Sequence, residues 1–204
     1  AICYHDGHDS LAKFDARPIR EVPIEGKDAE LKEAGIIRVT NTGFDEQILF
    51  DQDRMITAML RQPELQRRMT GTEFRNLLGK YYAAQEEAFG VRPGLLSTCW
   101  RNSVPVFVGA PGDGSAFLNS VKLWALAKLG KSEHKFDLDL HAEVFESCAY
   151  HYWGLTASEA KQIGILILGG GVPKNFALQP EPTLSQIFRL DGITGYEYDV
   201  QIVG

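Results

Sequence analysis

The chain has 204 residues, of which 44% are hydrophobic and 24% charged, and its formal net charge is −6. This length suits one large domain, and the balanced composition argues against intrinsic disorder. An acidic chain repels phosphate backbones, so nucleic acid is a poor candidate partner. No apolar run reaches the roughly 18 residues that crossing a membrane requires.

Cysteine usage points to a reducing compartment, and we expect the cytoplasm. The three cysteines, Cys3, Cys99 and Cys148, form no CxxC pair, which argues against a disulfide framework. A short cluster of His and Asp at residues 5–9 matches no zinc-site spacing, so no metal is predicted. The first residues also lack the pattern of a signal peptide.

Short elements are predicted near the N-terminus. Their order is a strand within Ile19–Ile24, a helix over Asp28–Ala34 that Gly35 ends, and a strand over Ile36–Val39.

The clearest predicted helix spans Gly71–Phe89. Thr70–Glu73 has the spacing of a capping box, in which two side chains cap the first backbone amides reciprocally. Apolar residues then recur at helical spacing along one stripe, namely Phe74, Leu77, Leu78, Tyr81 and Tyr82. Gly90 ends the pattern.

An apolar, β-rich run begins the second half of the chain. Val104–Val108 is predicted to be a buried strand, and it leads directly into the turn Gly109–Ser115. A helix is expected over Ala116–Leu129. The order is that of a strand, a glycine-rich turn and a helix.

A second run of the same kind follows. Thr156–Glu159 resembles another capping box, with a short helix expected after it. Ile163–Leu168 is predicted to be a buried strand that ends in Gly169–Gly171, and Tyr198–Val203 a third strand. Strands alternating with helices predict an α/β fold: an open parallel sheet with helices on both faces, in a single domain over residues 1–204.

The two junctions between strand and glycine are the candidate site. In open parallel sheets, ligands bind beyond the carboxyl ends of the strands, and glycine lets the backbone approach them closely. Asp113 would accept hydrogen bonds from a ribose, and Ser115 would contact phosphate or cap the next helix. Neither junction is a GxGxxG or P-loop motif, so a plain turn stays equally open. No GxSxG elbow supports a hydrolase.

Three segments resemble signatures of the deoxyhypusine synthase family, in the family's order and approximate spacing. Val104–Ser115 resembles its strand and P-A-x-x-D-G-S turn, and Ile165–Lys174 resembles its strand ending in L-G-G-G-V-x-K. Glu30–Val39 resembles its L-x-x-x-G-I-x-R-I segment. Asn175 after the second signature resembles the bacterial deoxyhypusine synthase-like branch.

The resemblance implies a Rossmann-like fold, NAD as cofactor, and a homotetramer with active sites between paired subunits. It implies an NAD-dependent transferase that moves an aminobutyl group from a polyamine such as spermidine to an enzyme Lys. The group then passes to a protein Lys, or to a small amine, as in homospermidine synthases. The cofactor-binding residues it implies are Asp113, Gly114, Ser115, Gly169, Gly170, Gly171 and His5.

Two substrate positions depart from the family pattern. Leu118 stands where the family has an Asp that holds an amine, and Asn175 stands where it has a His. Losing one charge-assisted hydrogen bond, worth roughly 1.5–3 kcal/mol, would weaken spermidine binding about ten- to a hundredfold. We therefore expect a substrate other than spermidine, or lost activity.

The family's remaining parts are expected outside this sequence. Its N-terminal NAD-binding segment should precede Ala1, and its S-W-G-K motif with the catalytic Lys should follow Gly204. The chain is thus expected to be the central part of a longer protein, with its catalytic residue unassigned.

Three functions remain open from sequence: an aminobutyl transferase, a non-catalytic member that binds NAD or a partner subunit, and a nucleotide-binding module unrelated to polyamines. The aromatic stretches Tyr81–Tyr82 and Tyr150–Trp153 are candidate subunit contacts.

Overall fold

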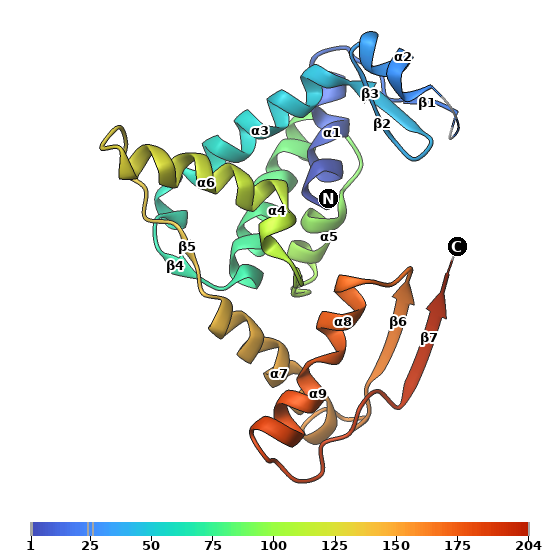
Figure 1. Ribbon diagram of the computed structural model, residues 1–204, viewed down its shortest axis with the longest axis vertical. Coiled ribbons are helices and arrows are strands. Elements are labelled where there is room, and N and C mark those ends of the chain that lie inside the picture. The colour runs from blue at the N-terminus through green and yellow to red at the C-terminus, as the bar shows by residue number, and fades with distance from the viewer. Residues whose placement is uncertain (1, 24, 26, 204) are drawn as a thin grey trace. The chain divides into compact units, whose positions relative to one another are not determined.

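The computed structural model describes residues 2–23, 25 and 27–203, with side chains described from residue 7 onward. The contacts divide the chain into two compact units (Figure 1). Unit 1 comprises Ala1–Met69, Glu73–Val106 and Gly112–Asp137. Unit 2 comprises Thr70–Thr72, Phe107–Pro111 and Leu138–Gly204.

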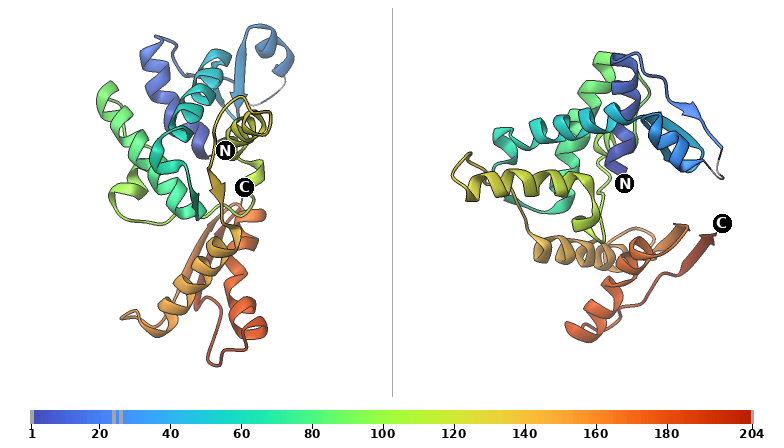
Figure 2. Two further views of the ribbon diagram at one scale, coloured as in Figure 1. Left: turned by 90° about the vertical axis from the view of Figure 1, so that its left-hand side faces the viewer. Right: turned by 45° about the horizontal axis from the view of Figure 1, so that its top comes forward.

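Unit 1 is mainly helical. Its elements, lying wholly or mostly within it, are α1 (Ile2–Phe14), β1 (Arg20–Glu21), α2 (Asp28–Glu33), β2 (Ile36–Val39), β3 (Thr42–Asp45), α3 (Glu46–Leu60), η1 (Pro63–Leu65), β4 (Arg68–Met69), α4 (Gly71–Phe89), α5 (Leu95–Arg101), η2 (Pro111–Asp113) and α6 (Ser115–Lys128). Helix α1 packs against α3, α5 and α6, as two further views show (Figure 2). Every element predicted from sequence before residue 90, and the helix predicted after residue 115, is confirmed.

Unit 2 contains a pair of parallel strands. Its elements are α7 (Leu140–Thr156), β6 (Gly164–Leu168), α8 (Val172–Leu178), α9 (Pro180–Pro182), η3 (Thr183–Ile187) and β7 (Tyr198–Ile202). Strands β6 and β7 lie side by side with Gly164 opposite Tyr198 and Leu168 opposite Ile202 (Figure 1). Both predicted strands in this part of the chain, and their parallel direction, are thereby confirmed.

The described strands form three small sheets. Strands β1, β3 and β2 form an antiparallel sheet in that order, and β4 pairs with β5 (Asp137–Leu138). With the parallel β6–β7 pair, the chain is a mixed helix and strand protein of the α/β type. A continuous parallel sheet covered by helices on both faces is not formed by the residues that the structure describes, so the Rossmann-like arrangement stays a prediction.

The junction between β3 and α3 is held by a helix cap. The carboxylate of Asp45 accepts a hydrogen bond of 2.8 Å from the backbone N–H of Gln47, and it pairs with Arg17 at 2.6 Å. The backbone hydrogen bond, followed by the Arg17 contact and opposed by desolvation, lowers the pKa of Asp45 below its ordinary value. The helix therefore begins where a carboxylate satisfies one of its first backbone N–H groups.

Part of the predicted apolar stripe of α4 lies in the core of unit 1. Phe74, Leu78 and Tyr82 are all at most 2% exposed, and the hydroxyl of Tyr82 accepts a hydrogen bond of 2.7 Å from Gln52. Tyr82 is thus a core residue, and the interpretation of Tyr81–Tyr82 as subunit-contact surface is wrong for this member of the pair.

The end of α4 is joined to α5 by a buried carboxylate. Glu86 is 2% exposed, and it accepts hydrogen bonds from the backbone N–H of Gly94 at 2.7 Å and from the hydroxyl of Ser97 at 2.8 Å. The guanidinium of Arg101 lies 3.4 Å from its second oxygen. A buried charge needs such partners, so this contact fixes how α5 begins.

Close approach of the same two helices depends on a glycine. A Cβ atom at Gly79 would collide with the backbone carbonyl of Leu96 and would lie 2.9 Å from Cβ of Trp100. Only a residue without a side chain lets the two backbones pack at this separation.

The predicted strand over Val104–Val108 is wrong, because this segment has no regular secondary structure. Its backbone groups bond to partners outside any sheet. The N–H of Val104 donates to the carbonyl of Cys99 at 2.9 Å, and the carbonyl of Val106 accepts from Arg75 at 2.7 Å. Apolar composition alone therefore does not determine which hydrogen-bond partners the backbone N–H and C=O groups of this segment have.

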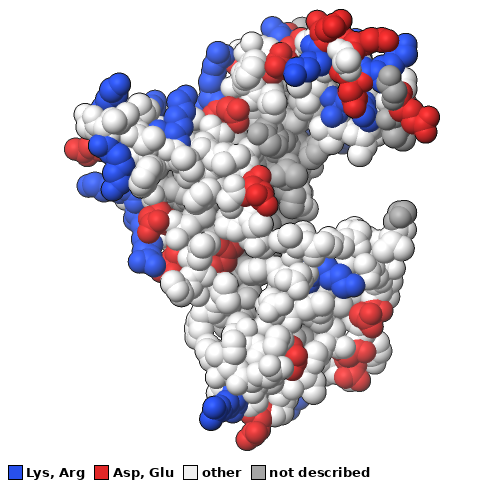
Figure 3. Space-filling view, viewed as in Figure 1, with Lys and Arg blue, Asp and Glu red and all other residues white. Residues whose placement is uncertain are grey.

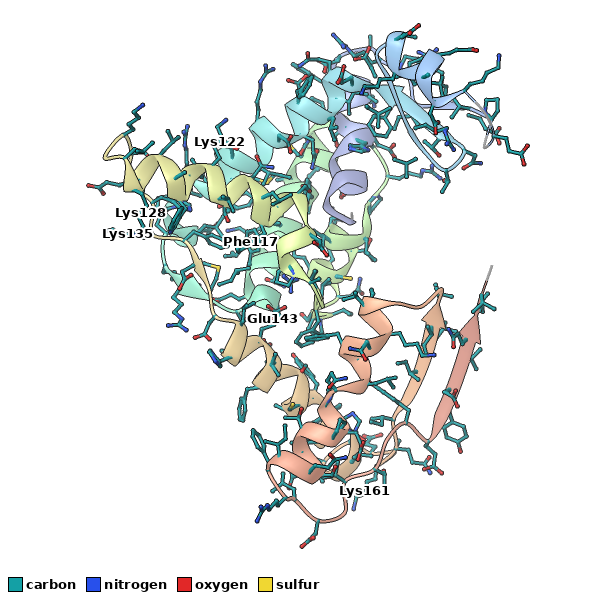
Figure 4. The ribbon with its side chains drawn as sticks, in the orientation of Figure 1. Phe117, Lys122, Lys128, Lys135, Glu143 and Lys161 are labelled. Carbon is teal, nitrogen blue, oxygen red and sulfur yellow. The ribbon has the colours of Figure 1, made fainter. Side chains whose placement is uncertain are left out.

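The short helix predicted after Thr156–Glu159 is also wrong. Helix α7 ends at Thr156, and the hydroxyl of Ser158 donates to the carbonyl of Gly154 at 2.5 Å. The same hydroxyl accepts from the backbone N–H of Lys161 at 3.1 Å, in the turn before β6 (Figure 4). These residues therefore close a helix instead of opening one.

Strand β6 is covered on one face only. Ile167 is 9% exposed, whereas its neighbours Leu166 and Leu168 are 64% and 74% exposed. The prediction that β6 is buried on both faces is therefore wrong for the described part of the chain. An alternating pattern is what a strand with one open face produces.

Candidate functional site

The turn before α6 carries the first group of predicted site residues. Asp113 is exposed at the end of η2, Gly114 is the N-cap of α6, and Ser115 is the first residue of the helix. Leu118, one turn further on, is 53% exposed. Phe117, beside it in sequence, marks this end of α6 in Figure 4. The structure thus brings Asp113, Gly114, Ser115 and Leu118 together at one helix start.

The prediction that Ser115 caps α6 is wrong. The N-cap is Gly114, whose extended backbone, with φ −91° and ψ 135°, makes no side-chain cap. Ser115 is buried, and its hydroxyl has no hydrogen-bond partner among the described residues. The sequence placed the boundary one residue late, because glycine and serine both suit an N-cap.

Polar contacts to α3 hold this helix start in place. The amide nitrogen of Asn119 donates to a carboxylate oxygen of Asp53 at 2.8 Å and to the carbonyl of Ser115 at 3.0 Å. Its amide oxygen accepts from the hydroxyl of Thr57 at 3.1 Å. These contacts fix the start of α6 within unit 1, and Asp113 lies directly before it.

The turn after β6 carries the second group. Gly169 and Gly171 have φ angles of +87° and +75°, a region that residues with side chains rarely adopt. A Cβ at either position would meet no atom within 4 Å, so open space borders the backbone there. The turn thus has the conformation and the room to let a ligand approach its main chain.

The side chain of Gln201, on β7, anchors this glycine turn. The amide of Gln201 donates to the carbonyl of Gly169 at 2.8 Å, and its oxygen accepts from the ammonium of Lys174 at 2.8 Å. Lys174 is therefore engaged in a structural contact. Asn175 is exposed on α8, where its side chain accepts a long hydrogen bond of 3.4 Å from Gln179.

The two groups belong to different units. Asp113, Gly114, Ser115 and Leu118 lie in unit 1, whereas Gly169–Gly171 and Asn175 lie in unit 2. Their meeting in one crevice stays a prediction. The side chain of His5 lies outside the described residues. No group of three or more potential metal ligands occurs in the part of the chain that the structure describes.

Sequence reasoning missed a cavity within unit 2. It has a volume of about 520 Å³, and its wall includes Phe107, Tyr150, His151, Phe176 and Tyr196. The signal in the sequence was the aromatic run around residue 151, which we interpreted only as contact surface.

These features define a mixed α/β protein in which exposed glycine-containing turns lead into helices. None of the described helices has the length and apolar character needed to cross a lipid bilayer.

The chain belongs to the deoxyhypusine synthase family, a family of transferases. The family model described as deoxyhypusine synthase matches residues 6–203. The resemblance expected from the three sequence signatures is thereby confirmed.

Curated relatives come from bacteria and archaea. A deoxyhypusine synthase-like protein of Cyanothece sp. is 33% identical over 208 residues, which cover 99% of this chain and 49% of the relative. One from Nostoc punctiforme is 34% identical over 98% of this chain and 48% of the relative. A probable deoxyhypusine synthase 2 of Methanosarcina mazei is 26% identical over 98% of this chain and 52% of the relative. The chain spans about half the length of the curated relatives it matches.

Proposed function

We propose that this chain is part of an NAD-dependent transferase that moves an aminobutyl group from a polyamine or a related amine. Membership of the deoxyhypusine synthase family, over residues 6–203, carries this proposal. The acceptor is a protein Lys or a small amine. The Lys that would carry the group during transfer is expected outside residues 1–204.

The glycine turns fit the cofactor that the family implies. Gly169–Gly171 offers open main chain with positive φ angles, and the exposed Asp113 stands at the start of a helix anchored on α3. In the proposed complex, Asp113 accepts hydrogen bonds from a ribose, and Gly114, Ser115 and the three glycines border the cofactor. NAD, when bound, supplies a hydride acceptor, while the protein orients the reactants and excludes water.

Alanine at Asp113 should weaken NAD binding about tenfold, because a charge-assisted hydrogen bond to the ribose is lost. Isothermal titration with NAD measures this directly. Asp191→Ala, which removes another exposed carboxylate, is the matched control and should bind like the unaltered chain. Equal affinity in all three proteins would leave Asp113 as a turn residue.

The amine substrate should differ from spermidine because of Leu118. This exposed leucine stands where the family has an amine-binding Asp, and an apolar side chain cannot pair with an ammonium. In the full-length protein, Leu118→Asp should raise spermidine-dependent NADH formation at subsaturating spermidine about tenfold. Leu118→Asn, of the same shape as Asp but uncharged, separates charge from size and should give little gain. Rapid turnover of spermidine by the unaltered protein would refute this prediction.

A non-catalytic family member that binds NAD or a partner subunit is the second candidate. Leu118 and Asn175, both in place of residues that the resemblance assigns to amine binding, favour it. If the protein is of this kind, it should bind NAD but should form no NADH when any polyamine is added.

We further propose that the protein forms a homo-oligomer, with a tetramer as the family's expected state. Large apolar side chains are exposed on α7 and β6, among them Phe145, Trp153 and Leu168. The face of unit 2 in Figure 3 carries few charged side chains. Apolar surface of this kind is typical of subunit interfaces.

A further inference from the structure

The side chain of Asn119 joins α6 to α3 through both ends of its amide. Its nitrogen donates to the carboxylate of Asp53 at 2.8 Å and to the backbone carbonyl of Ser115 at 3.0 Å, while its oxygen accepts from the hydroxyl of Thr57 at 3.1 Å. Both N–H groups of the amide are thereby used. The opposite orientation of the amide would set its oxygen against two acceptors, so these contacts favour a single orientation of the side chain.

The start of α6 is not held by a side-chain cap. Its N-cap is Gly114, which makes no side-chain cap, and glycine leaves the backbone more freedom than any other residue. The carbonyl that Asn119 binds belongs to Ser115, the first residue of the helix, which is buried. Asn119 therefore fixes the first turn of α6 from one turn further along the helix.

An asparagine inside a helix calls for a compensating contact. In a helix interior it is less favourable than alanine, leucine or lysine, because its amide competes with the backbone for hydrogen bonds. At position 119 the contact with Asp53 is made to a charged group, and such hydrogen bonds are roughly twice as strong as neutral ones. The contact to α3 thus offsets the low helix propensity of Asn119.

The helix start that Asn119 holds carries the first group of candidate cofactor residues. Asp113 is exposed directly before Gly114, and Ser115 follows. A ligand that binds such a turn gains affinity when the turn is already ordered, because less conformational entropy is lost on binding. The contacts of Asn119 would therefore change the affinity for a ligand that Asn119 itself does not touch.

We propose that Asn119 is a positioning residue for this cofactor turn. By holding the first turn of α6 on α3, it keeps the carboxylate of Asp113 in the orientation that accepts hydrogen bonds from the ribose of NAD. Asn119 acts through Asp113 and does not contact the cofactor. The inference rests on the proposed function, which supplies NAD as the ligand of the turn.

Exchanging the two partners tests the contact, with NAD affinity of the full-length protein measured by isothermal titration. Asn119→Asp sets two carboxylates against each other and should lower the affinity about tenfold. Adding Asp53→Asn restores an amide and a carboxylate with reversed roles, and it should return the affinity to within about threefold of the unaltered protein. Asn119→Ala adds no charge and should lose about fivefold. Asn76→Asp adds the same charge at an exposed position of α4 and should leave the affinity unchanged.

A double-mutant cycle with Asp113→Ala separates positioning from a general loss of structure. If Asn119 acts through Asp113, Asn119→Asp should lower NAD affinity less than about twofold once residue 113 is alanine. A general loss of structure would instead lower the affinity by the same factor with either residue at position 113. Circular dichroism at the temperature of the titration checks that each variant is folded.

The outcomes distinguish this inference from the proposed function. If the unaltered protein binds no NAD, both are overturned. If Asp113→Ala binds NAD as tightly as the unaltered protein, Asn119 has no residue to act through and the positioning role is refuted. If Asp113→Ala weakens binding, an unchanged affinity in Asn119→Asp, or an equal loss in both backgrounds, overturns the positioning role alone.

Discussion

Replacing Glu86 with alanine should lower the free energy of unfolding by about 3 kcal/mol. The carboxylate accepts from the backbone N–H of Gly94 and from the hydroxyl of Ser97; truncation leaves the N–H of Gly94 without this acceptor, whereas the hydroxyl of Ser97 keeps the carbonyl of Gly94, 3.2 Å away, as an acceptor. Each buried donor left unsatisfied costs about 1–3 kcal/mol. Arg101 adds less, since its partly exposed side chain can regain water. Urea denaturation followed by circular dichroism measures the difference.

The neighbouring Glu87 supplies the control for this experiment. It is exposed, so Glu87→Ala should change the free energy of unfolding by no more than about 0.5 kcal/mol. Ser97→Ala removes only one of the donors and should cost less than Glu86→Ala. A loss below 1 kcal/mol in Glu86→Ala would show that the α4–α5 junction does not depend on this carboxylate.

Valine at Gly79 should destabilise the protein by about 2–3 kcal/mol. A side chain normally improves on glycine in a helix interior by up to about 1 kcal/mol. Here, however, its first carbon would collide with the main chain of Leu96, which cannot rotate away as a side chain would. The steric cost should exceed the gain in helix propensity, and thermal unfolding gives the sign directly.

Asn76→Ala tests the propensity term separately. Asn76 is exposed on the same helix, so alanine there should be neutral or stabilising by about 0.5 kcal/mol. If Gly79→Val proves as stable as the unaltered protein, the close approach of α4 and α5 is not a constraint on this fold.

Periodicity predicted the parts of the fold that depend on local sequence. The spacing from Phe74 to Tyr82 specifies one buried face of α4, and Gly35 and Gly90, both with positive φ, mark helix ends. These signals act within a few residues, which is why their boundaries agree with the structure.

Long-range hydrogen bonding decided the elements that sequence misjudged. Val104–Val108 has the composition of a strand, yet Arg75, some thirty positions earlier, binds its carbonyl group. The open face of β6 likewise depends on which other elements pack against the strand. The composition of the strand does not specify these elements. For the candidate site, the sequence located both glycine turns, but it could not reveal that His151 lines a cavity.

The sequence before helix α3 contains an N-cap signal that the prediction did not use. Asp45 followed by Gln47 begins it with a side-chain cap, and Asp139 begins α7 in the same way by accepting from Ala142 at 3.0 Å. Acidic caps before long helices are readable from sequence. Both helices were absent from the sequence-based expectations, although the residues that cap them stand in the sequence.

Gln201 links the conformation of the glycine turn to the register in which β6 and β7 pair. Side chains alternate between the faces of a strand, so a shift of β7 by one residue would turn Gln201 to the opposite side of the sheet. It would then lose both the carbonyl of Gly169 and the ammonium of Lys174. If the two strands were misaligned during folding, the glycine turn would therefore lose these contacts before any ligand could bind.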